Sequence, residues 1–115
     1  MINSTVAFID AMTARYSELA PVVDENLADN DELLPHLVMA DVVRWLVDHR
    51  ADQQALVRSV LAWLEAAYEQ GDAEVRDVIA VSGVEMIPDP GEPGSELRDQ
   101  LGALLSAVDP WRDDL

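Results

Sequence analysis

Cysteine and lysine are absent from the sequence, and phenylalanine occurs only once. Without cysteine the chain can form no disulfide and offers no thiolate to a metal ion. The absence of cysteine fits a reducing compartment, and we expect a cytoplasmic protein. All seven basic residues are arginines. This usage, together with abundant Ala, Val and Asp, is a compositional hint of a GC-rich bacterial genome.

Long apolar runs are also missing. No uninterrupted apolar stretch approaches the length of about 18 residues that suggests a membrane-spanning helix. The first residues, MINSTVAFIDAMTARYSEL, have neither a basic region nor a long apolar core, so we do not expect a signal peptide. The sequence therefore predicts no contact with a membrane.

Positive charge is scarce, because 23 acidic residues stand against seven basic ones and the formal net charge is -16. A surface with this charge repels the phosphates of nucleic acids and anionic lipids. It attracts basic proteins and raises their association rate. We therefore expect a basic protein partner and no nucleic acid. The alternative is that the charge serves only solubility.

The sequence shows no recognisable catalytic arrangement. Neither His36 nor His49 belongs to a nucleophile motif, and their spacing of 13 residues does not suit two metal ligands on one helix. No glycine-rich loop joins a strand to a helix, so no phosphate cradle is expected. We expect no enzyme activity, no catalytic residue, no cofactor and no metal site. Weak binding of a divalent cation by scattered carboxylates stays open.

Apolar residues recur every three or four positions in five segments, a spacing typical of amphipathic helices. The five predicted helices run from Ser4 or Thr5 to about Ala20, over residues 33–50, from Asp52 to Gly71, from Asp72 to Ile87, and from about Ser95 to Ala107. Residues 21–32 are expected to be an acidic connector, part of which could form a short helix. Asn30 or Asp31 is expected to cap the second helix. Residues 88–94 contain three prolines and two glycines and interrupt the periodic pattern.

The strongest helical signal is a predicted hairpin from Gln53 to Ile87. We expect Gly71 to end its first helix in the left-handed conformation and Asp72 to cap the second. The low charge of the second helix indicates that it is the most buried, and Ser82-Gly83 indicates that another helix approaches closely. The sequence thus predicts an all-α fold, a compact bundle of about five helices around this central α-hairpin, in a single domain over residues 1–115 with an acidic tail from about residue 109.

Two acidic patches flank the hairpin and are candidate partner-binding sites. The connector patch consists of Asp24, Glu25, Asp29, Asp31 and Glu32. The loop patch consists of Asp89, Glu92, Glu96 and Asp99. Trp111 is a further candidate, either as an anchor for a partner or as a side chain that folds back on the core. For both patches the alternative is a solvated surface without a partner.

A further row on the predicted second helix consists of Asp41, Arg44 and Asp48. The spacing of three and four residues is typical of ion pairs on a helix surface, each worth about 0.2–0.5 kcal/mol. The alternative is that the row is partly buried and orders a binding face.

Three segments carry a family resemblance: LLPHLVMADVVRWLVDH, VLAWLEAAYEQGDAEVRDVIAVSGVEMI and LRDQLGALL. Over about residues 31–105 the chain resembles a largely uncharacterised family of small, acidic, mostly helical bacterial proteins that are met in polymorphic toxin and immunity settings. The most specific element is GDxEVxxxIxVSxxE, from Gly71 to Glu85. Similar sequences often carry a bulky aromatic residue after the serine, where this chain has Gly83. The resemblance implies an immunity or antitoxin-like protein.

Charge and resemblance together favour an acidic protein-binding module that neutralises a basic, toxin-like partner. The alternative is a homodimeric structural or adaptor protein whose apolar helix face joins two copies. A small acidic enzyme ranks third.

Overall fold

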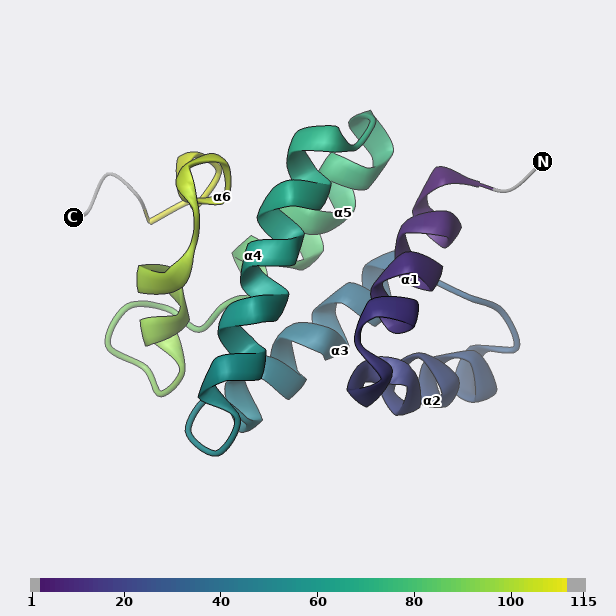
Figure 1. Cartoon of the computed structure of the whole chain (residues 1–115), viewed down its shortest axis with the longest axis horizontal. Coiled ribbons are helices and arrows are strands. Elements are labelled where there is room, and N and C mark those ends of the chain that lie inside the picture. The colour runs from purple at the N-terminus through teal and green to yellow at the C-terminus, as the bar shows by residue number, and fades with distance from the viewer. Residues whose placement is uncertain (1–2, 112–115) are drawn as a thin grey trace.

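The computed structural model describes residues 3–111, and these residues form helices and turns with no strand among them (Figure 1). Along the chain the elements are α1 (Ser4–Arg15), the 3-10 helix η1 (Ser17–Leu19), α2 (Ala20–Asn30), α3 (Pro35–Asp48), α4 (Gln54–Gln70), α5 (Ala73–Ser82), the 3-10 helices η2 (Val84–Met86) and η3 (Ser95–Gln100), and α6 (Ala103–Ala107). The predicted all-α class is confirmed. No helix of this described region combines the length and apolar character needed to cross a bilayer.

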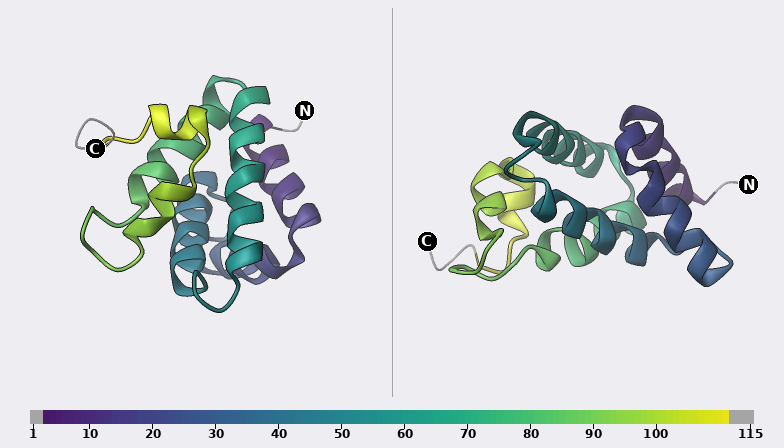
Figure 2. Two further views of the ribbon diagram at one scale, coloured as in Figure 1. Left: turned by 60° about the vertical axis from the view of Figure 1, so that its left-hand side comes forward. Right: turned by 90° about the horizontal axis from the view of Figure 1, so that it is seen from below.

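The central position belongs to α5, which packs against α1, α3, α4 and η2. Figure 2 shows α1 and α2 at one end of the long axis, η3 and α6 at the other, and α3, α4 and α5 between them. The molecule measures 41 × 30 × 23 Å. The predicted hairpin of α4 and α5 is therefore the centre of the bundle. Its second helix is deeply buried because Val75, Val78 and Ile79 all face the core.

One apolar cluster fills the space between the helices. Its largest fully buried side chains are Ile9, Met12, Leu19, Met39, Leu46, Ile79, Leu97 and Leu105. They come from both ends of the chain as well as from the hairpin. Burying one such side chain stabilises a fold by about 1.5–3 kcal/mol. The cluster explains how a chain with this charge folds without disulfides.

The N-terminal third differs from the sequence-based expectation. Helix α1 ends at Arg15 instead of Ala20, and the connector is largely the 11-residue helix α2. The break has a physical reason in Pro21, which lacks an N–H and would clash with a carbonyl one turn earlier in a continuous helix. Proline is well suited to the first turn of a new helix, where α2 places it.

The expected cap of the second helix is wrong, and the third helix begins later than expected. Asp31 ends α2 in the left-handed conformation, with φ of 59°, instead of capping the next helix. Helix α3 begins at Pro35 after Leu34, and α4 follows Gln53 instead of Asp52. Neither Leu34 nor Gln53 makes a capping hydrogen bond through its side chain, so these two helices begin without the polar cap that the sequence pattern predicts.

Of the two expectations for the α4–α5 turn, the cap by Asp72 is confirmed and the left-handed conformation of Gly71 is wrong. The Asp72 carboxylate accepts a hydrogen bond from the Val75 N–H at 2.9 Å, which confirms the predicted cap. Gly71 is extended, with φ of -78° and ψ of 157°, so the expected left-handed conformation is wrong. Glycine is needed there for space, because a Cβ would lie 2.7 Å from Val75 Cγ1 and 2.9 Å from the Ala67 carbonyl oxygen.

The predicted helix to Ile87 ends at Ser82, and the backbone turns at Gly83 into η2. A Cβ on Gly83 would lie 2.3 Å from the Ile79 carbonyl oxygen and 3.4 Å from Met39 Cγ. Met39 belongs to α3, so the expected close approach of another helix is observed. A bulky aromatic side chain at this position would not fit this geometry.

The predicted last helix is divided into η3 and α6. The Glu65 carboxylate of α4 accepts hydrogen bonds from the Leu104 and Leu105 N–H groups, at 2.8 and 3.0 Å. A Cβ on Gly102 would lie 2.5 Å from the Glu65 carboxyl carbon. The interruption at Gly102 thus lets a carboxylate from another helix satisfy backbone donors at the start of α6.

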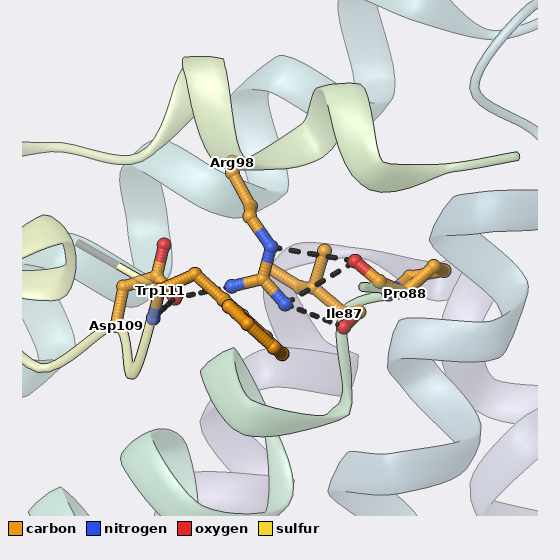
Figure 3. A network of polar contacts seen from close by, with 5 residues as sticks. All are labelled: Ile87, Pro88, Arg98, Asp109 and Trp111. Atoms are coloured by element: carbon orange, nitrogen blue, oxygen red, sulfur yellow. Dashed lines mark hydrogen bonds and ion pairs between the residues drawn. The ribbon is translucent and has the colours of Figure 1, made fainter. Parts of the chain in front are cut away.

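A buried ion pair joins Arg98 of η3 to Asp109 (Figure 3). Their side chains are 9% and 6% exposed. Arg98 also donates to the carbonyl oxygen of Ile87, at 2.7 Å, and to that of Pro88. Asp109 accepts the Trp111 N–H at 3.0 Å. Asp109 is therefore part of the fold rather than the first residue of an acidic tail, and residues 112–115 of that predicted tail lie outside the described region.

Replacing Asp109 with alanine should lower the free energy of unfolding by about 3–5 kcal/mol, because the buried Arg98 guanidinium would lose its counter-charge. Urea unfolding followed by circular dichroism measures this change. Asp99→Ala is the matched control, since Asp99 is exposed and its loss should cost less than about 0.5 kcal/mol. Equal effects of the two substitutions would contradict the assigned role of the ion pair.

Candidate functional site

A groove of about 250 Å³ lies between α2 and α3. Its walls are Val22, Glu25, Asn26 and Asp29 from α2, and Asp41, Arg44, Trp45 and Asp48 from α3. Each set follows the spacing i, i+3, i+4 and i+7, which puts it on one side of its helix. The groove therefore exists because residues 20–30 are helical and lie beside α3.

Asn26 and Asp41 hold the two walls together. The Asn26 side chain is buried, and its amide donates to Asp41 Oδ2 at 2.5 Å and to the Val22 carbonyl oxygen at 3.3 Å. Arg44 forms an ion pair with the other carboxylate oxygen of Asp41. Asp41 and Arg44 thus largely neutralise each other. Of the row that the sequence indicates, Arg44 and Asp48 are exposed and only Asp41 is half-buried. The expected ion pair on the helix surface is present between Asp41 and Arg44.

Three further carboxylates in the groove, those of Glu25, Asp29 and Asp48, belong to exposed residues. Within residues 3–111, none of them forms an ion pair with a basic side chain. The half-buried Trp45 lies among them and packs against His49, with ring centroids 4.3 Å apart and an angle of 35° between the ring planes. The groove thus combines excess negative charge with an aromatic side chain, and this combination suits a cationic side chain.

The structure divides the connector patch. Glu25 and Asp29 line the groove, whereas Asp24, Asp31 and Glu32 are exposed and lie outside its walls. Sequence reasoning did not place Asp48 and Trp45 beside these carboxylates. The helical spacing of the residues on both walls indicates two facing helices. A reading of residues 21–32 as mainly a connector does not make use of this spacing.

The loop patch is divided as well. All four residues are exposed, and Glu96 in addition accepts hydrogen bonds from Arg50 Nε at 2.5 Å and from the Gly94 N–H at 3.1 Å. Glu96 therefore holds the start of η3 against the end of α3. A second hollow, of about 270 Å³, lies beside Glu96, Asp99 and the partly buried Trp111.

Both histidines contact residues of the fold. His36 Nδ1 lies 2.6 Å from the hydroxyl oxygen of Ser82, and its Nε2 lies 3.8 Å from Asp77. Because Ser82 is buried in α5, the first contact fastens the start of α3 to α5. His49 Nδ1 lies 3.2 Å from Asp52. Over residues 3–111, no three histidine or carboxylate side chains are grouped so that they could hold a metal ion.

The fold and the groove together define a small acidic helical bundle with a carboxylate-lined groove. The chain belongs to the family described as a domain of unknown function (DUF7674), which it matches over residues 9–108. This match begins earlier than the segments that suggested a family resemblance, and it includes both walls of the groove. Comparisons with curated proteins and with solved structures found no match.

Acid should weaken the fold through Glu96 and Asp72. Hydrogen bonds from the Glu96 backbone N–H and from Arg50 lower the pKa of the Glu96 carboxyl group. The Val75 N–H and the Ser4 hydroxyl lower the pKa of Asp72 in the same way. A carboxyl group whose pKa is lower in the folded state contributes stability above its unfolded pKa and loses it as the pH falls through the folded value.

We expect the free energy of unfolding to begin falling near the ordinary carboxyl pKa of about 4 and to keep falling below it. The Asp72→Asn/Glu96→Gln variant should lose less stability than the wild type between about pH 5 and pH 3. Urea unfolding at each pH measures the difference. An identical pH dependence for the two proteins would show that these carboxyl groups do not contribute.

Proposed function

We propose that this protein binds a basic segment of a partner protein in the α2–α3 groove and thereby neutralises the partner. The observation that carries the proposal is the set of exposed carboxylates of Glu25, Asp29 and Asp48 beside the Trp45 ring. An arginine side chain fits this chemistry best. Its guanidinium pairs with carboxylates through two parallel hydrogen bonds, and its flat face stacks on aromatic rings.

The charge of the whole molecule supports the same role. A net charge of -16 attracts a basic partner over a distance of about 10 Å at moderate ionic strength. Such steering raises the association rate, whereas buried contacts within the groove slow dissociation. The acidic surface and the groove would therefore act at successive stages of one encounter.

The resemblance to proteins met in toxin and immunity settings supplies the finer form of the proposal. Nuclease toxins need basic grooves to hold nucleic acid phosphates. An acidic helical protein that covers such a groove blocks access of the substrate, so the function needs no catalysis. We accordingly propose a binding protein of the immunity or antitoxin type that works in the cytoplasm without a cofactor.

The groove can be tested with an alternating Arg-Gly peptide and the variant Glu25→Gln/Asp29→Asn/Asp48→Asn. We expect the dissociation constant to rise at least about tenfold, because the loss of three nearby charges exceeds 1.4 kcal/mol in this setting. The indole signal of Trp45 in a heteronuclear NMR titration should move in the wild type. Binding should weaken further as the salt concentration rises.

The matched control is Asp89→Asn/Glu92→Gln/Asp99→Asn, which removes the same number and kinds of charge from the loop patch. Its dissociation constant should change much less than that of the groove variant. Equal weakening of binding by both variants would mean that the peptide responds to net charge alone, and the groove would lose its role. For the finer proposal, production together with the product of a neighbouring toxin-like gene should restore growth, and continued toxicity would contradict it.

A further inference from the structure

The solvent-facing side of α4 carries little charge for this protein. The α4 ridge consists of Ala55, Ala62 and Ala66, which are all exposed and are spaced by seven and four residues. These spacings place the three alanines along one line of the helix. Small side chains on such a line allow another helix to approach to the short end of the usual range of about 8–10 Å.

A hollow of about 410 Å³ lies beside the ridge, between α4 and the antiparallel helix α1 (Figure 1). The stacked rings of Phe8 and Trp63 lie there, with centroids 5.6 Å apart. Ala7, Ala11 and Ala66 form further parts of its wall, and every side chain that lines it is uncharged. This face therefore offers apolar surface and room for side chains of an opposing helix.

Arg58 and Glu69 flank the ridge near its two ends, and both are exposed. Eleven residues separate them, so they lie on the same side of α4 at an axial distance of about 16 Å. In the part of the chain that the structure describes, neither side chain has an ion-pair partner. Arg15 and Arg76 also lack a carboxylate partner there, but they lie over the rings of Tyr16 and Tyr68. Arg58 has no such contact among the residues that the structure describes.

We propose that a second copy of this chain packs its α4 antiparallel across the ridge and the neighbouring hollow. The midpoint between Arg58 and Glu69 lies between residues 63 and 64, and the midpoint between Ala62 and Ala66 is residue 64. A two-fold axis at this position places Ala62 opposite the partner's Ala66 and Arg58 opposite the partner's Glu69. Each dimer then contains two intermolecular ion pairs, one on each half of the interface.

The charge of the molecule is compatible with contact at this face. Two copies with a net charge of -16 repel each other, so they can approach closely only where like charges do not meet. The ridge and hollow meet this condition, and their flanking charges are complementary under the two-fold axis. The proposal is independent of the α2–α3 groove, since none of the groove residues belongs to this face.

Charge exchange tests the arrangement most sharply, because Arg58 and Glu69 are too far apart to pair within one copy. Arg58→Glu should weaken self-association at least about tenfold, equivalent to ~1.4 kcal/mol. Arg58→Glu/Glu69→Arg should restore it, since the opposite charges then meet with exchanged positions. Sedimentation velocity over a concentration series at about 0.15 M salt measures the self-association constants.

Ala62→Glu places a charge at the centre of the interface and should abolish the dimer. Ala28→Glu is its matched control, because Ala28 is an exposed alanine within α2, and it should leave the dimer intact. Circular dichroism confirms that each variant is folded. A monomeric wild type at every concentration, equal effects of the two alanine substitutions, or no recovery in the charge-exchanged variant would each overturn the proposal.

Discussion

The C-terminal quarter of the bundle depends on the buried guanidinium of Arg98. It binds Asp109 on one side and the carbonyl oxygens of Ile87 and Pro88 on the other. These contacts fold the chain after α5 back on the hairpin, where Leu97 and Leu105 become fully buried. An ion pair in this position gains stability only when hydrogen bonds compensate for its desolvation, and the two carbonyl groups provide that compensation. The loop of residues 88–94 thereby has both of its ends attached to the core.

At the opposite end of the molecule, the groove depends on a hydrogen bond between a neutral amide and a carboxylate. The Asn26 amide bridges α2 to the Asp41 carboxylate of α3 and leaves the other carboxylate oxygen to Arg44. Because this pairing uses one acidic and one basic residue, it fixes the walls without consuming the carboxylates of Glu25, Asp29 and Asp48. Asp41 therefore stabilises the fold, whereas the other acidic residues of the groove form its negatively charged surface.

Four of the arginines also hold the fold together. Arg44, Arg50 and Arg98 pair with carboxylates inside the structure, and Arg76 donates to the carbonyl oxygens of Tyr68 and Glu69. A guanidinium can make several directed hydrogen bonds at once, which a lysine ammonium cannot do with the same planar geometry. Arg50, Arg76 and Arg98 use this geometry to connect segments that are separate in the sequence.

The sequence by itself determined the helical class, the hairpin and the Asp72 cap, because each depends on residues within a few turns of one another. It also identified the acidic character of Glu25 and Asp29, although not the groove that they line. Only the tertiary structure decided that Asp48 and Trp45 face them, that Glu96 pairs with Arg50, and that Asp109 is buried against Arg98. The physical reason is that local periodicity specifies which side of a helix is apolar, whereas the partner of a charged side chain is set by how distant helices pack.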